Sequence, residues 1–506
     1  MSLARTWSVG LAGVHGALVE VEVDMSAGVP GVVLVGLPDA VVRQSVDRVR
    51  AAVVNAGASW PLRRVTIGLS PASMPKQGSG FDLALAAGVL AAAEVVPAGA
   101  VADLVLLGEL GLDGTVRAIR GVLPAVLAAR QAGHRQVVVP VGNADEAALV
   151  DGVTVLPASS LRELLAHLTG RALLEPHVRG VLPEPPPGPD LGDVVGQAVG
   201  RRAVEVAAAG GHHLFLAGPP GAGKTMLAER LPGLLPALDE QSALEVTAIH
   251  SVAGTLPSGA PLVTRPPFEA PHHSATMAAL VGGGSGLIRP GALCRAHRGV
   301  LFLDESPEFP RAVLDTLRQP LERGSVTISR AAGSATFPCR AQLVLAANPC
   351  PCATAAGDAA CTCSAAERRR YQSRLSGPLL DRIDLRVDLP PVTRASWLDG
   401  IEAPESSAVV AARVAAARAT AQERMRGSGL TLNAQVPGRL LRERWVVPRS
   451  ASRLAERALE RGVLSVRGLD RVLRVAWTLA DLAGRSVPGP EHVAEALGMR
   501  LQRVAA

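Results

Sequence analysis

The chain has 506 residues, of which 48% are hydrophobic and 19% charged, a globular composition that allows roughly two to four domains. No apolar run reaches the roughly 18 residues that a membrane-spanning helix needs, and the first residues lack a signal-peptide pattern, so we expect a cytoplasmic protein without a membrane partner. Aromatic residues make up only 2%, which argues against base stacking as the main means of binding nucleic acid. The net charge of +6 gathers after residue 438, where 13 arginines face seven acidic residues, and indicates either a nucleic-acid contact or a solvated helix face.

Residues 1–170 carry the pattern of an α/β domain. The alternation at residues 19–23 predicts a half-buried strand, and the apolar run at 31–38 predicts a buried one. Apolar residues recur at helical spacing over residues 40–55, which predicts a helix. Further strands are expected at 64–69, 104–107 and 136–140, and further helices at 81–93 and 124–132.

Two glycine-rich segments of this domain, residues 75–82 and 108–124, resemble those that carry the catalytic serine and lysine of Lon-type proteases. The serine position of that pattern falls on Gly80 and the lysine position on Leu123, although Ser79 is adjacent to the first. Because a serine without a nearby base is a weak nucleophile, the resemblance implies a Lon-protease-like fold with an inactive dyad. We expect a structural or assembly domain here rather than a peptidase.

A linker and a phosphate-binding motif follow. Residues 171–192 include the run Glu-Pro-Pro-Pro-Gly-Pro-Asp, which cannot continue a helix or a central strand, so we expect an extended linker there. The apolar residues 214–217 predict a short buried strand, and residues 218–225 then match the pattern G-x-x-x-x-G-K-T ahead of a helix. In such a loop the glycines aim backbone N–H groups at phosphate oxygens, Lys224 reaches the terminal phosphates and Thr225 holds Mg²⁺.

A second strand ends in two carboxylates. Residues 298–303 are mostly apolar and lead into Asp304 and Glu305. This order assigns Mg²⁺ binding to Asp304, directly or through water, and polarisation of the attacking water to Glu305. An ordinary strand end with solvated acids is the alternative, and the phosphate loop upstream favours the functional interpretation.

Residues 193–390 resemble the core of AAA+ ATPases, which is an α/β fold built around a P-loop. A third strand at 342–347 ends in Asn348, and the resemblance assigns to this amide the positioning of the attacking water. It also places the segment that contains Gly196 and Gln197 against the adenine. The expected nucleotide-binding residues are therefore Gly196, Gln197, Gly218, Pro219, Pro220, Gly221, Ala222, Gly223, Lys224 and Thr225.

Two insertions interrupt this core. The first contains His272 and His273 and a glycine-rich run. Since adjacent residues of a strand point to opposite faces, we expect a loop or capping role for the two histidines rather than a metal site. The second insertion, residues 324–337, has two β-prone runs around a turn and predicts a hairpin.

Four motifs resemble the magnesium-chelatase-like AAA+ ATPases of the ComM (YifB) type: PHHS at 271–274, LDE at 303–305, NPCPC at 348–352 and LSGPLLDRID at 375–384. The resemblance covers nearly the whole chain. It implies a homo-oligomeric, hexameric ring that hydrolyses ATP and drives branch migration on single-stranded or branched DNA during recombination of incoming strands. The two insertions would be its pore hairpins, with Arg330 as a contact to DNA phosphate.

Four of the six cysteines form the pairs Cys350-x-Cys352 and Cys361-x-Cys363. Four thiols at this range in a reducing compartment indicate a tetrahedral Zn²⁺ site beside Asn348. Because C-x-C is a less usual ligand spacing than C-x-x-C, free structural thiols are the alternative.

Residues 391–506 predict an all-α lid, and two arginine roles depend on it and on the segment before it. An ATPase ring needs a cation that a neighbouring subunit supplies to the γ-phosphate. The resemblance assigns this role to Arg382, with Arg374 as second choice; a salt bridge from Arg382 to Asp381 or Asp384 is the alternative. Arg467 resembles the sensor arginine that reaches the nucleotide of its own subunit, or else is a surface residue. Lid helices are expected at 408–426, 453–461, 465–483 and 491–504.

We therefore expect an ATP-driven DNA translocase or helicase. A metal-chelatase-type motor that acts on a protein partner and an ATP-dependent unfoldase or protease are the alternatives. The Lon-like front domain argues against the first, because magnesium-chelatase subunits of this kind lack it. The missing dyad argues against the second.

Overall fold

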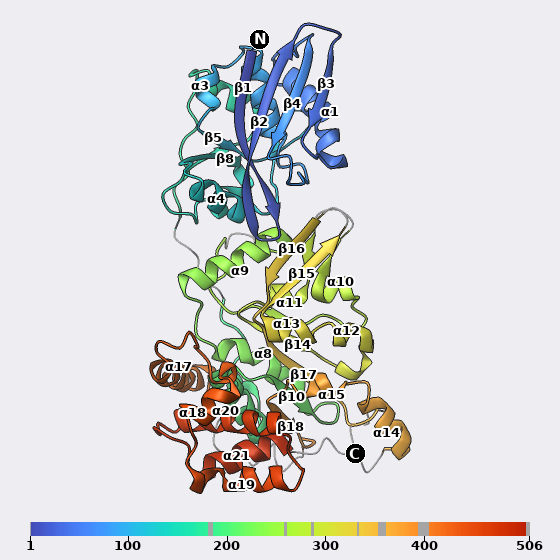
Figure 1. Cartoon of the computed structure of the whole chain (residues 1–506), viewed down its shortest axis with the longest axis vertical. Helices are drawn as coiled ribbons and strands as arrows, with labels where there is room; N and C mark the ends of the chain where they lie inside the picture. Colours follow the sequence, from blue (N-terminus) through green and yellow to red (C-terminus); the bar gives the residue numbers. More distant parts are fainter. Residues whose placement is uncertain are drawn as a thin grey trace.

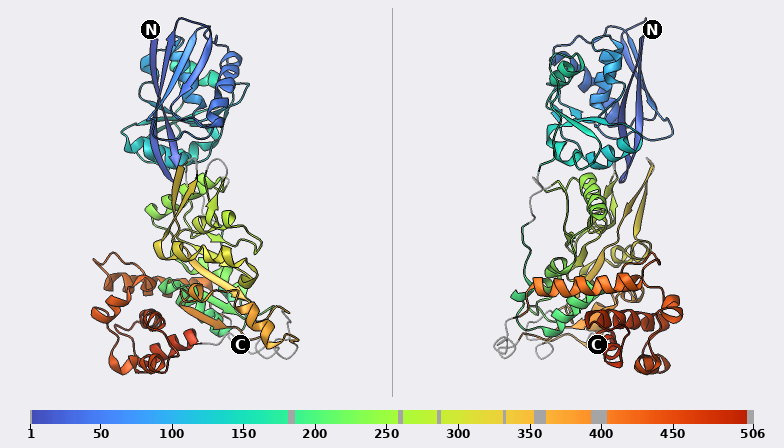
Figure 2. Two further views of the ribbon diagram at one scale, coloured as in Figure 1. Left: turned by 45° about the vertical axis from the view of Figure 1, so that its right-hand side comes forward. Right: turned by 90° about the vertical axis from the view of Figure 1, so that its left-hand side faces the viewer.

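The computed structural model describes residues 2–180, 186–257, 261–284, 288–330, 333–352, 361–392 and 404–501. An α/β domain lies at the N-terminal end of the long axis, a second α/β domain lies in the middle, and a helical region lies at the other end (Figure 1). The same order is visible from two other sides in Figure 2. None of the helices in the described ranges is long and apolar enough to cross a membrane.

A seven-stranded sheet with the order β3-β4-β2-β1-β5-β8-β9 organises the first domain. The antiparallel pair β1–β2 lies at its centre, and β5, β8 and β9 continue it in parallel. Its strands are β1 Ser2–Ala12, β2 His15–Ser26, β3 Gly31–Val35, β4 Arg64–Ser70, β5 Leu104–Leu106, β8 Gln136–Pro140 and β9 Thr154–Ala158. A short antiparallel pair, β6 Glu109–Leu110 with β7 Val116–Arg117, stands apart from it.

Helix α2 packs against β1 and β2 of this sheet. Every residue of α2 is buried, as expected for a helix that is apolar on all sides. Helix α1 starts where the carboxylate of Asp39 accepts a hydrogen bond of 2.7 Å from the backbone N–H of Val42. The helices of the domain are α1 Ala40–Asn55, α2 Asp82–Ala92, α3 Ala98–Val101, α4 Val122–Gln131, α5 Ala144–Ala147 and α6 Leu161–Leu168.

A five-stranded parallel sheet with the order β11-β14-β17-β10-β18 forms the middle domain. Its three central strands are buried throughout, which parallel strands covered on both faces require. A parallel sheet with the phosphate loop directly after β10 agrees with the α/β core expected from the resemblance to AAA+ ATPases. The strands are β10 Leu214–Ala217, β11 Phe268–Glu269, β14 Val300–Leu303, β17 Gln342–Ala347 and β18 Leu385–Asp388.

Helices and two small hairpins surround this sheet. The predicted hairpin is present as β15 Ser325–Arg330 and β16 Gly333–Pro338, and a second, short pair is formed by β12 Gly282–Gly283 and β13 Arg289–Pro290. The helices are α7 Ala198–Gly210, α8 Lys224–Leu234, α9 Glu240–Ala253, α10 Met277–Val281, α11 Ala292–Arg295, α12 Arg311–Asp315, α13 Arg318–Arg323, α14 Ala365–Gln372 and α15 Gly377–Leu380.

The C-terminal region is helical. Its longest helices, α17 and α20, pack against α7 of the AAA+ core, so the core and the lid share one hydrophobic cluster. Helix α20 begins at Ser465, whose hydroxyl accepts a hydrogen bond of 3.1 Å from the N–H of Gly468. The helices are α17 Ser407–Arg424, α18 Gly438–Glu443, α19 Arg449–Glu460, α20 Val466–Leu482 and α21 Pro490–Leu501.

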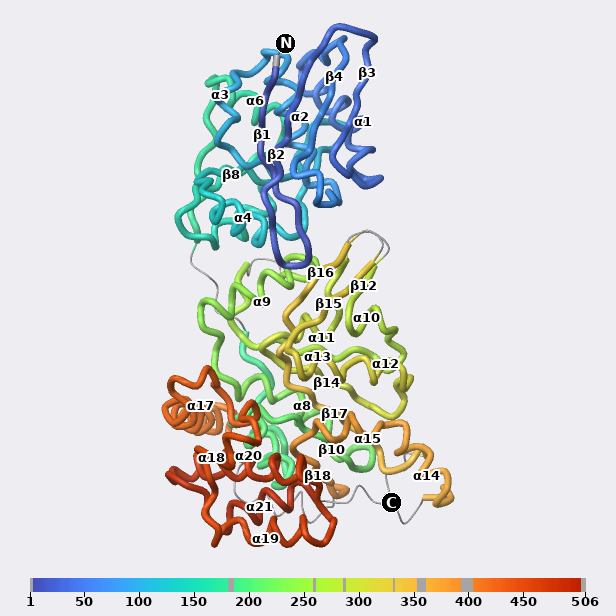
Figure 3. Tube along the Cα trace, viewed as in Figure 1, coloured from blue at the N-terminus to red at the C-terminus, as the bar shows by residue number. Residues whose placement is uncertain are grey.

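The Lon-like domain docks on the AAA+ core at two places. Helix α4 packs against α9, where Glu146 accepts hydrogen bonds from the hydroxyl of Ser251 and from the N–H of Leu123. The turn between β1 and β2 lies against β16, as the chain trace in Figure 3 shows, and Leu11 beside it packs on the core of the AAA+ domain. Burial raises the pKa of Glu146.

The predicted burial of residues 31–38 is wrong. The strand β3 is at the edge of its sheet and pairs with β4 on one side only, so Val33 and Val35 remain 41% and 48% exposed. An apolar run does not reveal by itself whether a second strand or a helix will cover it. Parts of five expected segments lie outside the described residues: 181–185 in the linker, 285–286 in the glycine-rich run of the first insertion, 331–332 in the hairpin, 393–403 before the lid helices and 502–504 at the end of the last helix.

Candidate nucleotide-binding site

The phosphate loop connects β10 to α8 at the carboxyl ends of three adjacent parallel strands. The N–H of Gly218 donates to the carbonyl of Ala347 at 3.2 Å, which fixes the start of the loop to β17. Gly221 and Gly223 have φ angles of 77° and 83°, a region that favours glycine. The loop thus leads directly into the N-terminus of α8, where backbone N–H groups are available to an anion.

Lys224 is held at the centre of this loop. Its ammonium donates to the carbonyls of Gly218 and Pro219 at 2.8 and 3.0 Å and to Oδ1 of Asn348 at 3.0 Å. The side chain is buried, and burial lowers its pKa, while Asp304 and Glu305 act in the opposite direction. A buried ammonium whose neighbours are mostly carbonyl oxygens suits a phosphate oxygen as a further partner.

The carboxylate of Asp304 lies beside the loop. The hydroxyl of Thr225 donates to its Oδ2 at 2.7 Å, and the N–H of Glu305 donates to its Oδ1 at 2.8 Å. A hydroxyl and a carboxylate oxygen side by side are the donors that Mg²⁺ prefers. These two residues therefore fit the metal that the motif implies.

Glu305 directs its carboxylate to His273 instead of to the loop. Nδ1 of His273 is 3.2 Å from Oε2 of Glu305, and Glu305 has a left-handed backbone with φ of 47°. His273 follows β11 in a turn, so the expectation of a loop position fits, but its contact with Glu305 was missed. The rings of His272 and His273 are 4.0 Å apart rather than on opposite faces, because neither residue belongs to a strand.

The expected adenine side is at the start of α7. The amide of Gln197 donates to the carbonyl of Pro390 at 2.7 Å, next to the residues that follow β18. Its Oε1 is buried and has no hydrogen-bond partner within the described ranges. Gly196 and Gln197 have φ angles of 70° and 46°, which turn the chain sharply into the helix.

Arg382 and Arg467 line one cavity of about 250 Å³, and this cavity is not at the phosphate loop. It lies near the amino ends of the strands, where Arg471 binds Asp384 at 2.6 Å and Asp384 contacts the backbone of His213 just before β10. The four-residue strand β10 separates that edge from the loop by about 13 Å. The structure therefore places Arg467 away from the phosphate loop of its own chain.

The two candidates for the trans-acting arginine have other partners than expected. Arg382 forms an ion pair with Glu322 and donates to the carbonyl of Pro378 at 2.6 Å, so the anticipated bridge to Asp381 or Asp384 is absent from the contacts of Arg382 in the described ranges. Arg374 binds Glu308 at 2.7 Å, in the turn that follows Glu305.

Arg330 is exposed at the end of β15, beside the short β12–β13 pair. Its guanidinium lies so close to Gly283 that a Cβ placed there would be 3.2 Å from Nη2. Arg289, which pairs with Gly283 across the short hairpin, is also exposed. The two insertions thus meet at a basic surface.

Known proteins resemble this chain over nearly its full length. Family models described as magnesium chelatase subunit ChlI, subunit ChlI of Mg-chelatase and magnesium chelatase subunit ChlI C-terminal match residues 190–397, 21–143 and 404–500. The competence protein ComM of Haemophilus influenzae is 42% identical over 506 residues, covering 99% of this chain and 98% of ComM. The chain belongs to the ComM/YifB family of magnesium-chelatase-like proteins. Its motor is thus an AAA+-like ATPase of the magnesium-chelatase family.

Other relatives extend this likeness. The uncharacterised protein YifB of Escherichia coli is 40% identical over 506 residues, covering 99% of this chain and 97% of YifB. An uncharacterised protein of Mycobacterium tuberculosis is 56% identical over 503 residues, 99% of each chain. A shorter match, 32% identical over 97 residues, joins 19% of this ComM/YifB-type chain to 17% of Lon protease 2 of Bacillus subtilis.

The lysine position of the Lon-type dyad is occupied by a residue of the core, and two polar residues near the serine position bond to other groups. Leu123 is fully buried, and its N–H donates to Glu146 at 2.8 Å. The hydroxyl of Ser79 bonds to Glu109, and the buried ammonium of Lys76 bonds to the carbonyl of Pro71. Burial lowers the pKa of Lys76.

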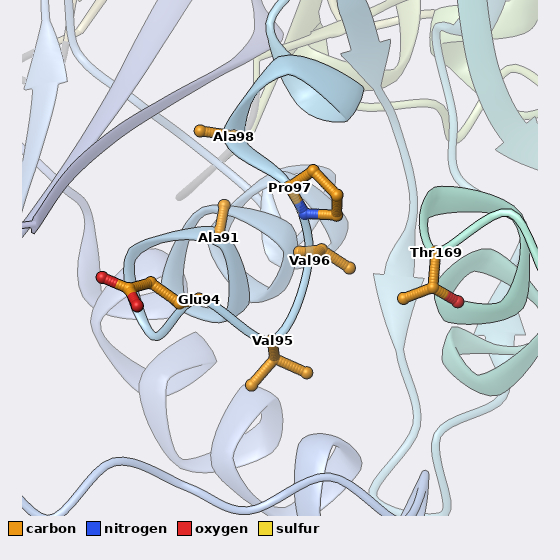
Figure 4. A pocket seen from close by; sticks show the side chains of 7 residues that line it. All are labelled: Ala91, Glu94, Val95, Val96, Pro97, Ala98 and Thr169. Atoms are coloured by element: carbon orange, nitrogen blue, oxygen red, sulfur yellow. The ribbon is translucent and has the colours of Figure 1, made fainter.

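A cavity of about 420 Å³ opens at the end of α2 in the Lon-like domain of this ComM/YifB-type chain. Figure 4 shows that its wall is mostly aliphatic, with the carboxylate of Glu94 and the hydroxyl of Thr169 as the only polar side chains drawn. It has no nucleophile and base side by side, and it is lined only by residues of the Lon-like domain.

The four cysteines of the two C-x-C pairs come together in this family member. The Sγ atoms of Cys350, Cys352, Cys361 and Cys363 all lie within 4.8 Å of one another. The two remaining cysteines, Cys294 and Cys339, are buried elsewhere in the AAA+ core.

Proposed function

We propose that the protein is a ring-shaped AAA+ motor that hydrolyses ATP and drives branch migration of DNA. The observation that carries the ATPase part is the convergence of Lys224, Thr225, Asp304 and Asn348 at the carboxyl ends of three adjacent strands. These side chains come from segments up to 124 residues apart, and they provide the ammonium, the hydroxyl and the carboxylate that phosphoryl transfer requires.

Each side chain has one task in this proposal. Lys224 binds the terminal phosphates, and Asn348, already bonded to Lys224, orients the attacking water. Thr225 and Asp304 would hold Mg²⁺, which offsets phosphate charge when bound. Glu305 accepts the proton of the water, and it must first leave His273 to do so. The Oε1 of Gln197, which has no hydrogen-bond partner among the described residues, would accept from an amino group of the base.

The proposal of a ring rests on the position of the arginines. Arg382 and Arg467 share one cavity near the amino edge of the sheet, and no residue of the phosphate loop lines it. A neighbouring subunit that presents this edge to the loop would bring both of them to the γ-phosphate. We therefore assign both arginines to the site of the adjacent subunit, in a homo-oligomer that we take to be a hexamer.

DNA is the polymer along which we propose that the motor moves. Arg330 and Arg289 make an exposed basic surface where the two insertions meet, and exposed arginines bind phosphate through charge-assisted hydrogen bonds. The relative in Haemophilus influenzae is a competence protein, which fits the handling of incoming DNA.

The test is ATP turnover by the full-length protein with and without DNA, together with displacement of strands from a four-way junction. We expect branched DNA to stimulate turnover more than linear duplex of equal length. In the variant Arg330→Ala, DNA affinity should fall and the slope of log affinity against log salt should decrease by about one. Arg130→Ala, at an exposed arginine of the Lon-like domain, is the matched control.

ATP turnover that ignores DNA, with no strand displacement, would contradict the DNA motor. It would favour a chelatase-type motor that acts on a protein partner. Peptide cleavage that depends on Ser79 would instead favour a protease.

A further inference from the structure

Four cysteines lie together in the AAA+ core, and the proposed ATPase mechanism gives them no role. Sγ of Cys350 is 3.1 Å from Sγ of Cys352 and 3.4 Å from that of Cys361, and Cys352 is 3.6 Å from Cys361. All four Sγ atoms fit within 4.8 Å of one another. We propose that Cys350, Cys352, Cys361 and Cys363 bind one Zn²⁺.

The distances favour a single ion. With Zn–S bonds of about 2.3 Å, the sulfurs of a tetrahedral site are about 3.8 Å apart along every edge. The separations of 3.1, 3.4 and 3.6 Å are somewhat shorter than this value, and the remaining pairs lie within 4.8 Å. In an iron–sulfur cluster the cysteines bind different irons, so some of the sulfurs must be farther apart than in a mononuclear site.

Four protein ligands leave no open position on the metal, so the site is structural and takes no part in chemistry on the ion itself. The position of the zinc site in the fold indicates its structural role. Cys350 comes two residues after Asn348, and Cys363 precedes the N-terminus of α14, where Ser364 and Glu367 form a capping box. The metal would therefore join the end of β17 to the start of α14.

One hydrogen bond already connects these elements, and a second fixes Cys363 to the first turns of α14. Gln372 of α14 donates to the carbonyl of Pro349 at 3.3 Å, and Arg368 donates to the carbonyl of Cys363 at 3.3 Å. A Zn²⁺ between them would hold the backbone that carries Asn348, whose side chain contacts Lys224 at 3.0 Å. The ion is thus a positioning element for the sensor asparagine.

The test begins with the metal content of full-length protein purified without chelator. We expect elemental mass spectrometry to find about one zinc per chain. The double variant Cys350→Ala/Cys361→Ala should lose it. The matched control Cys294→Ala/Cys339→Ala removes two buried thiols outside the cluster and should keep it.

Cobalt provides a second readout that does not need the variants. Protein loaded with Co²⁺ in place of zinc should show the visible bands of a tetrahedral thiolate site, and zinc should abolish them. Protein that binds neither zinc nor cobalt, that contains iron and sulfide, or whose Cys350→Ala/Cys361→Ala variant keeps the metal would overturn the proposal.

The positioning role is measured separately. Removal of zinc from the folded wild-type protein should lower ATP turnover by about 10-fold to 100-fold, as expected when a group near the reacting atoms is misplaced, while nucleotide affinity stays nearly unchanged. Equal turnover with and without zinc would refute this role. Metal content is measured without ATP or DNA. The test of zinc binding is therefore independent of whether the protein is a DNA motor.

Discussion

Replacing Glu305 with glutamine tests the assignment of the general base most directly. The substitution keeps the size of the side chain and removes its negative charge and its ability to accept a proton. A positioned base typically contributes 10²-fold to 10⁴-fold to a rate, which is about 3 to 5 kcal/mol in the activation free energy. Lys224, Thr225 and Asp304 do not depend on Glu305 for their contacts with one another.

The contact with His273 is too weak to produce an effect of that size. The two side chains are 35% and 51% exposed, and a polar contact with that exposure contributes about 1 kcal/mol or less, which is about fivefold in a rate. We therefore expect Glu305→Gln to lower ATP turnover at least about 100-fold. His273→Ala should change it by less than about fivefold.

The assay is steady-state phosphate release at saturating ATP, combined with titration of a fluorescent nucleotide. The dissociation constant should stay within about threefold of the parent value, because the phosphate-binding groups are intact. Glu240→Gln, at an exposed position of α9, is the matched control. A Glu305→Gln variant that binds nucleotide normally and retains more than about a tenth of the turnover would refute the role of Glu305 as base.

Three further predictions concern other parts of the motor. Lys224→Ala should weaken nucleotide binding by about 10-fold to 100-fold in the same titration, because a charge-assisted hydrogen bond is lost; unchanged affinity would contradict the phosphate contact. Arg382→Ala should lower turnover by about 10³-fold or more, and adding Glu305→Gln chains, whose arginines are intact, should restore part of it if the arginine acts between subunits. Burial lowers the pKa of His297 to about 4, and its Nδ1 accepts from the N–H of Arg340 at 3.0 Å, so the unfolded chain takes up the proton first as pH falls. Stability should therefore be full above about pH 6.5 and decrease by up to about 3 kcal/mol towards pH 4, seen as a falling midpoint of urea unfolding; a His297→Gln variant with the same pH dependence would exclude this histidine as the cause.

The sequence by itself determined the features that depend on neighbouring residues. The phosphate loop is one run of eight residues, and its glycines, Lys224 and Thr225 act through local backbone geometry, so the pattern is readable without a fold. The strands that end in Asp304 and Asn348 were predictable for the same reason, because a buried parallel strand is a continuous apolar run. The placement of Asn348 beside the phosphate loop came from the resemblance to AAA+ ATPases, because the order of strands along the chain does not determine which of them are neighbours in the sheet.

Only the tertiary structure decided the contacts between segments that share no local pattern. His273 meets Glu305 because a turn after β11 brings it there, and a rule about alternating strand faces does not apply to a turn. Arg467 lies with Arg382 because α20 crosses the amino edge of the sheet, and no local signal fixes the edge against which a helix packs. The docking of Glu146 on Ser251 likewise joins two domains through buried polar groups. Packing of distant surfaces sets all three, and a one-dimensional pattern cannot encode which surfaces will meet.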